Sequence, residues 1–171
     1  MSAPVWRRLA RWRVPLGFAS AAAAFWLAQP TPRSLAAGLA VALPGELLRV
    51  WAAGHIVKGR EITTSGPYRF MRHPLYLGSS ILGAGFAIAA CSWPVAALVA
   101  AYLGLTLLAA VRTEEATLDD RFAGDYSRYR EGRFEGPARS FQWGRVMANR
   151  EHRTMAGFLI LGCLLAVKAW W

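Results

Sequence analysis

The chain of 171 residues is long enough for one domain; it is 55% hydrophobic, with a mean hydropathy of +0.26, and carries 20 Lys and Arg against 10 Asp and Glu. Charged and apolar residues are separated into blocks, which argues against a soluble nucleic-acid-binding protein. Its 2 cysteines, Cys91 and Cys163, lie in apolar stretches without metal-ligand spacing, so the sequence predicts no metal site and no disulfide framework.

The apolar blocks predict an all-α integral membrane protein with about five transmembrane helices, at about 14–29, 34–54, 75–90, 94–111 and 154–171. The third and fourth are the clearest, because residues 75–111 form a run of 37 without Asp, Glu, Lys or Arg. Pro94 interrupts this run and predicts a helical hairpin. We expect residues 1–171 to form a single membrane domain with cytoplasmic loops at 55–74 and 112–153.

The basic residues predict the orientation of these helices. An N-terminal segment rich in Arg and Trp, at residues 5–13, suits the membrane interface, and we do not expect it to be a cleaved signal peptide. With this segment cytoplasmic, 18 of the 20 basic residues fall on the inner side, and only Arg33 and Lys168 fall outside. The sequence therefore predicts an inner or plasma membrane protein with its N-terminus in the cytoplasm and its C-terminus outside. Attraction to anionic membrane lipids accounts for the excess of positive charge without nucleic acid.

Residues with special conformational or chemical properties gather before the third helix. Gly66-Pro67 marks a turn, and Pro74 can begin the helix, where its missing N–H costs nothing. Arg72 and His73 would then lie at the helix N-terminus, where free backbone donors favour anionic groups.

A second segment rich in polar residues follows the fourth helix. Glu114 and Glu115 are expected at its inner end, and Tyr126 and Tyr129 are three residues apart, on one helical face. Carboxylates that bind hydroxyls and tyrosine rings that stabilise a cation would suit a cofactor with ribose hydroxyls and a cationic centre. A basic interfacial loop followed by a solvated acidic helix end explains the same residues without a cofactor.

The two segments together resemble a known superfamily. Gly66-Pro67-Tyr68-x-x-x-Arg72-His73-Pro74-x-Tyr76-x-Gly78, followed by Glu114-Glu115-x-x-Leu118, Phe122, Tyr126 and Tyr129, is similar to the isoprenylcysteine carboxyl methyltransferases and phospholipid methyltransferases. This resemblance implies S-adenosyl-L-methionine as methyl donor in a cytoplasmic pocket and a lipid-like or small apolar acceptor that enters from the bilayer. It implies cofactor contacts at Arg60, Glu61, Ile62, Thr63, Tyr68, Arg72, His73, Pro74, Leu75, Tyr76, Glu114 and Glu115.

The residues that would handle the acceptor are less well defined. Where the isoprenylcysteine branch has an arginine one turn before the glutamate pair, this chain has Ala110, which argues against prenylcysteine as the acceptor. Methyl transfer needs alignment and no dedicated nucleophile, so we predict acceptor-orienting residues. The candidates are Arg112, Glu46, Asn149, Arg150 and Glu151. Glu46 is expected to pair with Arg49 inside the second helix. The segment 149–153 would close the site or serve as a salt-bridged interfacial anchor.

Two other functions are compatible with the sequence. A membrane reductase of the sterol-reductase type shares an element like Arg-His-Pro-x-Tyr, but it would bring more basic residues to the 2′-phosphate of NADPH. A non-catalytic membrane assembly or lipid-binding protein would tolerate loss of His73 and Glu114. The sequence leaves the acceptor and the oligomeric state open.

Overall fold

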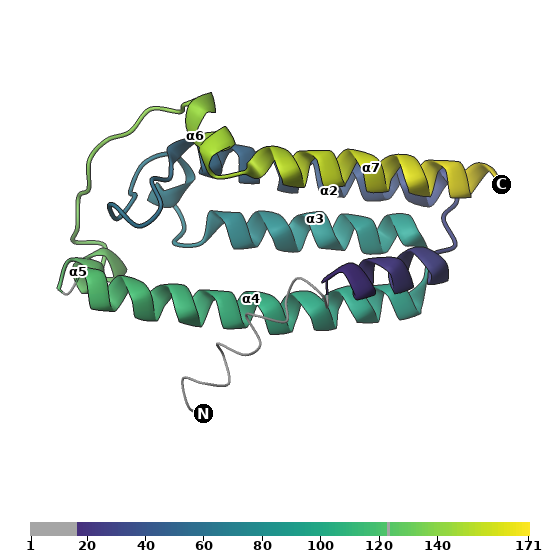
Figure 1. The fold of residues 1–171 in the computed structure, drawn as a ribbon, viewed down its shortest axis with the longest axis horizontal. Helices are drawn as coiled ribbons and strands as arrows, with labels where there is room; N and C mark the ends of the chain where they lie inside the picture. The colour runs from purple at the N-terminus through teal and green to yellow at the C-terminus, as the bar shows by residue number, and fades with distance from the viewer. Residues whose placement is uncertain (1–16, 123) are drawn as a thin grey trace.

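A computed structural model describes residues 17–122 and 124–171, which form helices and no strand (Figure 1). In chain order the elements are an apolar helix at Gly17–Leu27, α2 (Pro32–His55), the 3-10 helix η1 (Gly66–Arg69), α3 (Pro74–Ala90), α4 (Trp93–Arg121), α5 (Asp125–Arg130), α6 (Trp143–Ala148) and α7 (Glu151–Trp170). The prediction of an all-α membrane protein is confirmed. The predicted interfacial segment 5–13 and the start of the first predicted helix lie outside the described residues.

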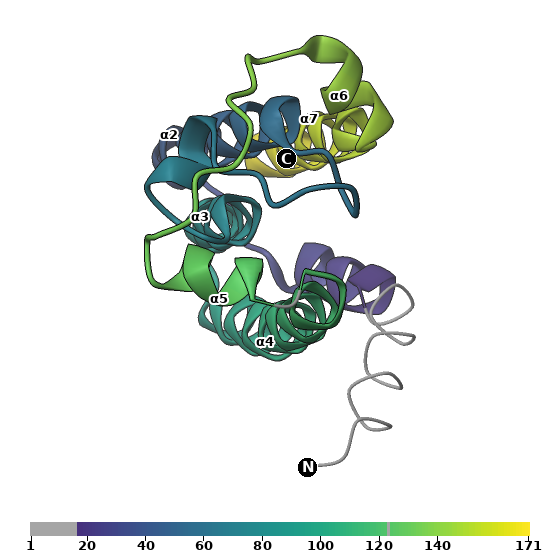
Figure 2. The ribbon, with the colours of Figure 1, turned by 90° about the vertical axis from the view of Figure 1, so that its left-hand side faces the viewer.

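The long helices run side by side, with α3 between two layers (Figures 1 and 2). On one side of α3 lie α2 and α7, and on the other lie α4 and the helix Gly17–Leu27. The connections η1, α5 and α6 all gather at one end of the bundle, and the C-terminus lies at the opposite end (Figure 1). The two predicted cytoplasmic loops, 55–74 and 112–153, therefore lie at a common end of the bundle. Which compartment this end faces stays a prediction.

The length and composition of the helices suit a bilayer. Three of them, α2, α4 and α7, are long and apolar enough to cross a membrane, and the two shorter apolar helices, Gly17–Leu27 and Pro74–Ala90, pack among them. Only 11% of the most apolar window of α4 and 6% of that of α7 are buried inside the protein. Apolar surface of this extent in a soluble protein would be unusual, whereas lipid chains would cover it.

The fourth helix differs from the prediction, because α4 continues past the expected end at residue 111 to Arg121. The segment Arg112–Arg121 contains neither Gly nor Pro, and the hydroxyls of Thr113 and Thr117 donate to the carbonyls of Ala109 and Thr113, each at 2.8 Å. The change from apolar to polar residues at Arg112 thus marks a change of surroundings and not the end of the helix. The expected loop 112–153 also contains α5 and α6.

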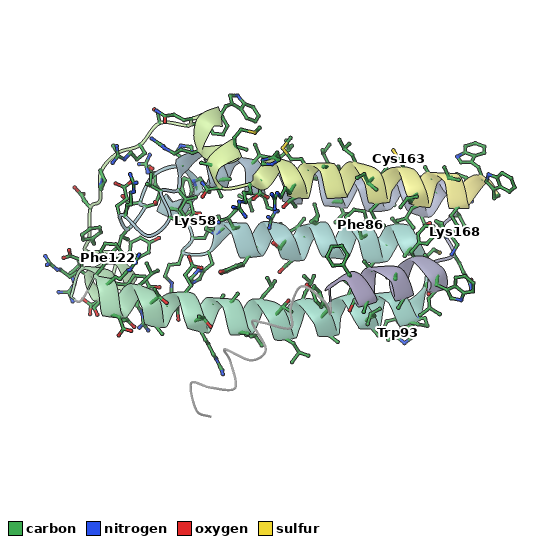
Figure 3. All side chains as sticks on the ribbon, viewed as in Figure 1. Lys58, Phe86, Trp93, Phe122, Cys163 and Lys168 are labelled. Atoms are coloured by element: carbon green, nitrogen blue, oxygen red, sulfur yellow. The ribbon has the colours of Figure 1, made fainter. Side chains whose placement is uncertain are left out.

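Lys168 has a structural role at the end of the bundle remote from the connections. Its ammonium donates to the carbonyls of Phe25 at 2.7 Å and Trp26 at 3.0 Å, at the C-terminus of the helix Gly17–Leu27. Figure 3 shows Lys168 and Trp93 at this end, and Lys58 and Phe122 at the other. Lys168, one of the two exceptions to the predicted charge asymmetry, therefore satisfies carbonyls that the helix end leaves without partners.

Small residues let α2 and α3 approach closely. A Cβ atom added to Gly38 of α2 would lie 2.5 Å from the Cβ of Ala89 in α3, and one added to Gly45 would lie 2.8 Å from the carbonyl oxygen of Gly78. Such close backbone contact is how helices gain packing energy where lipid removes the hydrophobic driving force between them. This α2–α3 pair forms the rigid part of the fold on which the candidate site is built.

We predict that Gly38→Ala destabilises the purified protein by about 1–3 kcal/mol, because α2 and α3 must separate to accept the methyl group. Gly104→Ala, on α4, is the matched control, since nothing lies within 4 Å of its added Cβ. This control should be neutral or slightly stabilising through its better helix propensity. The measurement is thermal unfolding in detergent. Equal midpoints for the two variants would contradict the close contact of α2 and α3.

Candidate functional site

A cavity of about 410 Å³ lies at the end of the bundle where the connections gather. Its walls come from the loop after α2, from η1, the start of α3, the second half of α4, and α5. Pro74 positions the start of α3, and the continuation of α4 as a helix beyond the apolar run carries Glu114 to the same place. The two segments singled out in the sequence therefore meet at one cavity.

Hydrogen bonds join the Arg-His-Pro-x-Tyr segment to the glutamate pair. The Tyr76 hydroxyl donates to Oε2 of Glu114 at 2.6 Å, and Nε2 of His73 lies 3.2 Å from Oε1 of Glu115. Nη1 of Arg72 lies 3.5 Å from the same Glu115 oxygen, which the Tyr126 hydroxyl approaches to 3.5 Å. Glu114 thus lines the cavity, while Glu115 holds His73 and Arg72 in place from behind it.

Three tyrosines close the cavity from the side of η1 and α5. The Tyr129 hydroxyl donates to the backbone carbonyl of Tyr68 at 3.2 Å and ties α5 to η1. Burial raises the pKa of Tyr68, with the charge of Glu114 as a further cause, and burial also raises the pKa of Tyr129. Burial and then the charge of Glu115 raise the pKa of Tyr126 to about 12. All three phenols stay protonated at neutral pH and can donate hydrogen bonds, but they cannot act as bases.

Two buried hydroxyl groups in this wall have no hydrogen-bond partner among the described residues. They are Oγ1 of Thr63 and the Tyr68 hydroxyl. A buried polar group without a partner costs about 1–3 kcal/mol. Both residues line the cavity, so a ligand with polar groups could satisfy them.

Most of the predicted cofactor residues line this cavity, namely Glu61, Ile62, Thr63, Tyr68, Arg72, His73, Tyr76 and Glu114. Arg60 is exposed outside it, Pro74 is buried at the start of α3, and Leu75 packs against the buried cluster of Ala52, Ile56 and Tyr68. Glu61 accepts two hydrogen bonds from Arg139, at 3.0 and 2.7 Å, and these bonds lower the pKa of its carboxyl group.

Of the predicted acceptor residues, only Glu46 and Glu151 come together, beside Arg49. Arg112 is exposed on α4 and does not line the cavity. The Asn149 amide donates to the carbonyls of Ala53 at 3.0 Å and Ile56 at 3.2 Å, where α2 ends. Arg150 has a left-handed backbone conformation, with φ of 60°, at the N-terminus of α7. In the structure Asn149 and Arg150 shape the junction of α6 with α7.

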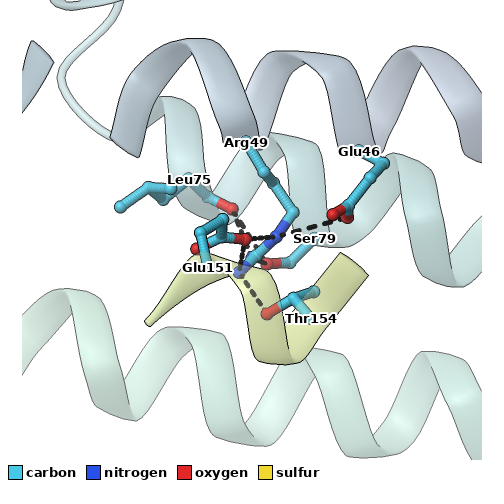
Figure 4. A network of polar contacts seen from close by, with 6 residues as sticks. All are labelled: Glu46, Arg49, Leu75, Ser79, Glu151 and Thr154. Atoms are coloured by element: carbon cyan, nitrogen blue, oxygen red, sulfur yellow. Dashed lines mark hydrogen bonds and ion pairs between the residues drawn. The ribbon is translucent and has the colours of Figure 1, made fainter. Parts of the chain in front are cut away.

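Glu46 and Glu151 belong to a polar network inside the bundle, centred on Arg49 (Figure 4). Nη2 of Arg49 lies 2.6 Å from Oε1 of Glu151, whereas its Nε lies 3.9 Å from Glu46. The ion pair of Arg49 with Glu46, which the sequence predicted, is therefore weaker than the ion pair of Arg49 with Glu151. Arg49 also donates to the Ser79 hydroxyl, to Oγ1 of Thr154 at 3.3 Å and to the Leu75 carbonyl at 3.2 Å. This one guanidinium connects α2, α3 and α7.

A second cavity, of about 290 Å³ and mostly apolar, lies among the helix Gly17–Leu27, α3, α4 and α7. Three members of the polar network, Arg49, Ser79 and Thr154, are part of its lining. Tyr102 of α4 lines this cavity and also the first one. A mostly apolar chamber within the bundle thus adjoins the first cavity, to which Glu114 and the tyrosines add polar groups.

Sequence reasoning missed several α4 residues that line the first cavity, including Tyr102, Thr106, Ala109 and Thr113. They are spaced three or four residues apart on the helical face that also carries Glu114 and Thr117. Extending a helical periodicity backwards from Thr117 would have found them. It also missed Arg121, whose Nη1 donates to the Gly59 carbonyl at 2.9 Å at the rim of the cavity.

Comparison with known proteins identifies the segment that carries both motifs. Residues 47–125 match the family model of phospholipid methyltransferases. This segment belongs to that family. The resemblance drawn from the two motifs is confirmed, and the chain is a membrane protein with a methyltransferase-family domain. The phospholipid methyltransferase match runs from α2 to the start of α5 and so includes most of the walls of the first cavity.

Two curated relatives are bacterial metal-resistance proteins. The nickel-cobalt-cadmium resistance protein NccN of Alcaligenes xylosoxydans xylosoxydans is 34% identical over 84 residues, which are 47% of this chain and 39% of the relative. The cobalt-zinc-cadmium resistance protein CzcN of Cupriavidus metallidurans is 30% identical over 125 residues, 67% of this chain and 56% of the relative. The chain thus spans about half the length of these relatives. No solved structure matches it.

The polar network yields a test of stability. Arg49→Met leaves the buried carboxylate of Glu151 without its cation, and we predict a loss of roughly 3–5 kcal/mol in the free energy of unfolding. Adding Glu151→Gln should recover part of the loss. Arg33→Met, an exposed position on the same helix, is the control and should resemble the parent. Chemical unfolding in detergent measures all four proteins. An Arg49→Met protein as stable as the parent would contradict the role of Arg49 in holding α2, α3 and α7 together.

Proposed function

We propose that this protein transfers a methyl group from S-adenosyl-L-methionine to a lipid-like or small apolar acceptor that enters from the bilayer. The observation that carries the proposal is the meeting of the two motifs at one cavity, where Tyr76 bonds to Glu114 at 2.6 Å. The family of residues 47–125 supports methyl transfer in general. Methyltransferases of this family typically use S-adenosylmethionine. No comparable observation favours the reductase considered above.

The residues of the first cavity fit the methyl donor. Its volume of about 410 Å³ lies within the range of about 300–1,000 Å³ that small-molecule sites occupy. Glu114 and the unpartnered hydroxyls of Thr63 and Tyr68 would hold the hydroxyl and amino groups of the cofactor. Leu105 and Ala109 provide an apolar wall for its base, and the rings of Tyr126 and Tyr129 suit a cationic centre.

The part of the protein in the reaction is to position the reactants and exclude water. When bound, the cofactor supplies a methyl carbon activated by a positively charged sulfur. Around it, the bond from Tyr129 to Tyr68 and the bond from Arg121 to Gly59 close the cavity with α5 and the end of α4. Alignment of reactants in a closed site can provide much of the rate acceleration without a nucleophilic side chain.

The apolar part of the acceptor would occupy the second cavity. Its walls include Phe86, Leu103 and Leu161, and Tyr102 is shared with the cavity assigned to the donor. Arg49 is the polar group best placed to orient such an acceptor, because it lines this cavity. Glu46 and Glu151, predicted from the sequence to orient the acceptor, would then act as positioning residues for Arg49. In this proposal the donor cavity faces the cytoplasm, and the C-terminus lies outside.

The proposal is tested by binding of S-adenosylhomocysteine to the protein in detergent, measured by isothermal titration calorimetry. We expect the parent to bind, and we expect Glu114→Gln and Tyr76→Phe each to weaken binding about tenfold, the cost of one charge-assisted hydrogen bond. Glu131→Gln is the matched control, because Glu131 is an exposed acid that bonds to Arg133 and does not line the cavity. A parent that does not bind, or an equal loss in the control, would contradict the proposal.

A further inference from the structure

A third cavity, of about 1070 Å³, adjoins the donor cavity along Tyr68, Arg72 and Tyr129, which line both. Its charged lining residues are Arg69, Arg72, Arg130 and Arg139, together with the single acid Glu135. They come from η1 and the residues that follow it, from α5, and from the long connection after α5. The cavity therefore has an excess of positive charge contributed by three separate parts of the chain.

Part of this charge is not neutralised within the protein. Arg139 is paired with Glu61 at 2.7 Å, and Arg72 lies 3.5 Å from Glu115. Arg69 and Arg130 make no ion pair with any residue between 17 and 171 that the structure describes. Two guanidinium groups at the cavity are thus available for an anion, and guanidinium groups suit phosphate because they can donate two parallel hydrogen bonds.

A buried hydroxyl in the same wall gives independent evidence for a ligand. Ser65 is 8% exposed, and its Oγ atom has no hydrogen-bond partner in the described part of the chain. It lines the third cavity directly before η1. A buried hydroxyl loses its bonds to water without compensation unless a ligand supplies an acceptor. An anionic oxygen in the cavity would accept this hydrogen bond.

The position of the cavity relative to the bilayer indicates where the anion comes from. Trp51, at the end of α2 near the connections, and Phe70, after η1, also line the cavity, and their side chains are 42% and 76% exposed. Exposed aromatic residues at the end of a transmembrane helix lie at the level of lipid headgroups. The arginines beside them are therefore at the depth of lipid phosphates.

We propose that the third cavity binds the phosphate group of an anionic phospholipid. Arg69 and Arg130 provide the charge, Ser65 donates a hydrogen bond, and Trp51 and Phe70 contact the lipid beside its headgroup. This site is separate from the donor cavity and shares only a wall with it. Binding here does not depend on methyl transfer. The phospholipid proposal can therefore be tested independently of the proposed function.

The test uses the full chain in detergent without methyl donor, titrated with dihexanoyl phosphatidic acid in a calorimeter. The double variant Arg69→Gln and Arg130→Gln should bind this lipid at least about tenfold more weakly, and Ser65→Ala several-fold more weakly. Arg128→Gln is the matched control. It removes one positive charge from α5, the helix that also carries Arg130, but Arg128 bonds to Asp125 at 2.7 Å and does not line the cavity. Its affinity should match the parent's.

Three results would overturn the proposal. An equal loss with Arg128→Gln would mean that the lipid responds to the overall charge and not to this cavity. Inorganic phosphate that binds as tightly as the lipid would make a soluble anion the ligand. Displacement of the lipid by S-adenosylhomocysteine would mean that the two ligands share one site. Because the titration contains no donor, failure to bind S-adenosylhomocysteine would count against the proposed function alone.

Discussion

The hydrogen bond between Tyr76 and Glu114 is the contact on which the candidate site depends. It joins the first turn of α3 to α4 across the cavity, and beside it Glu115 accepts His73 and Arg72. Since α3 packs tightly against α2 through small residues, the position of Tyr76 is set by the rigid side of the bundle. The site therefore lies where the rigid pair of α2 and α3 meets α4, which continues as a helix beyond its apolar segment.

The bilayer explains why polar groups concentrate at one end of this small protein. Within the bundle an ionisable side chain needs a partner, and Arg49 has two carboxylates and two hydroxyls around it. Beyond the apolar run, the same helices can carry carboxylates and tyrosines next to water. The second cavity within the bundle and the first cavity at its end share Tyr102. An apolar acceptor could therefore remain in the bundle, while Glu114 and the tyrosines of the first cavity meet the polar groups of a donor.

Much of this arrangement could be predicted from the sequence, because its strongest signals are local. The run of residues 75–111 without charge, broken by Pro94, indicated the α3–α4 hairpin, and the two motifs indicated the family. The pairing of Arg49 with Glu151 could not be foreseen, since the two residues are 102 positions apart and Glu46 is a nearer candidate in the chain. The end of α4 was misjudged because polarity was taken as a sign of helix termination.

The most direct test of the central claim is to find which residues lie beside the methyl donor. The protein in detergent is irradiated with methyl-labelled S-adenosylmethionine, digested, and mapped by mass spectrometry. If the two motifs share one donor cavity, the label will appear in peptides from both 58–76 and 102–129. Label confined to one of these segments, or label in the α6–α7 junction instead, would contradict it.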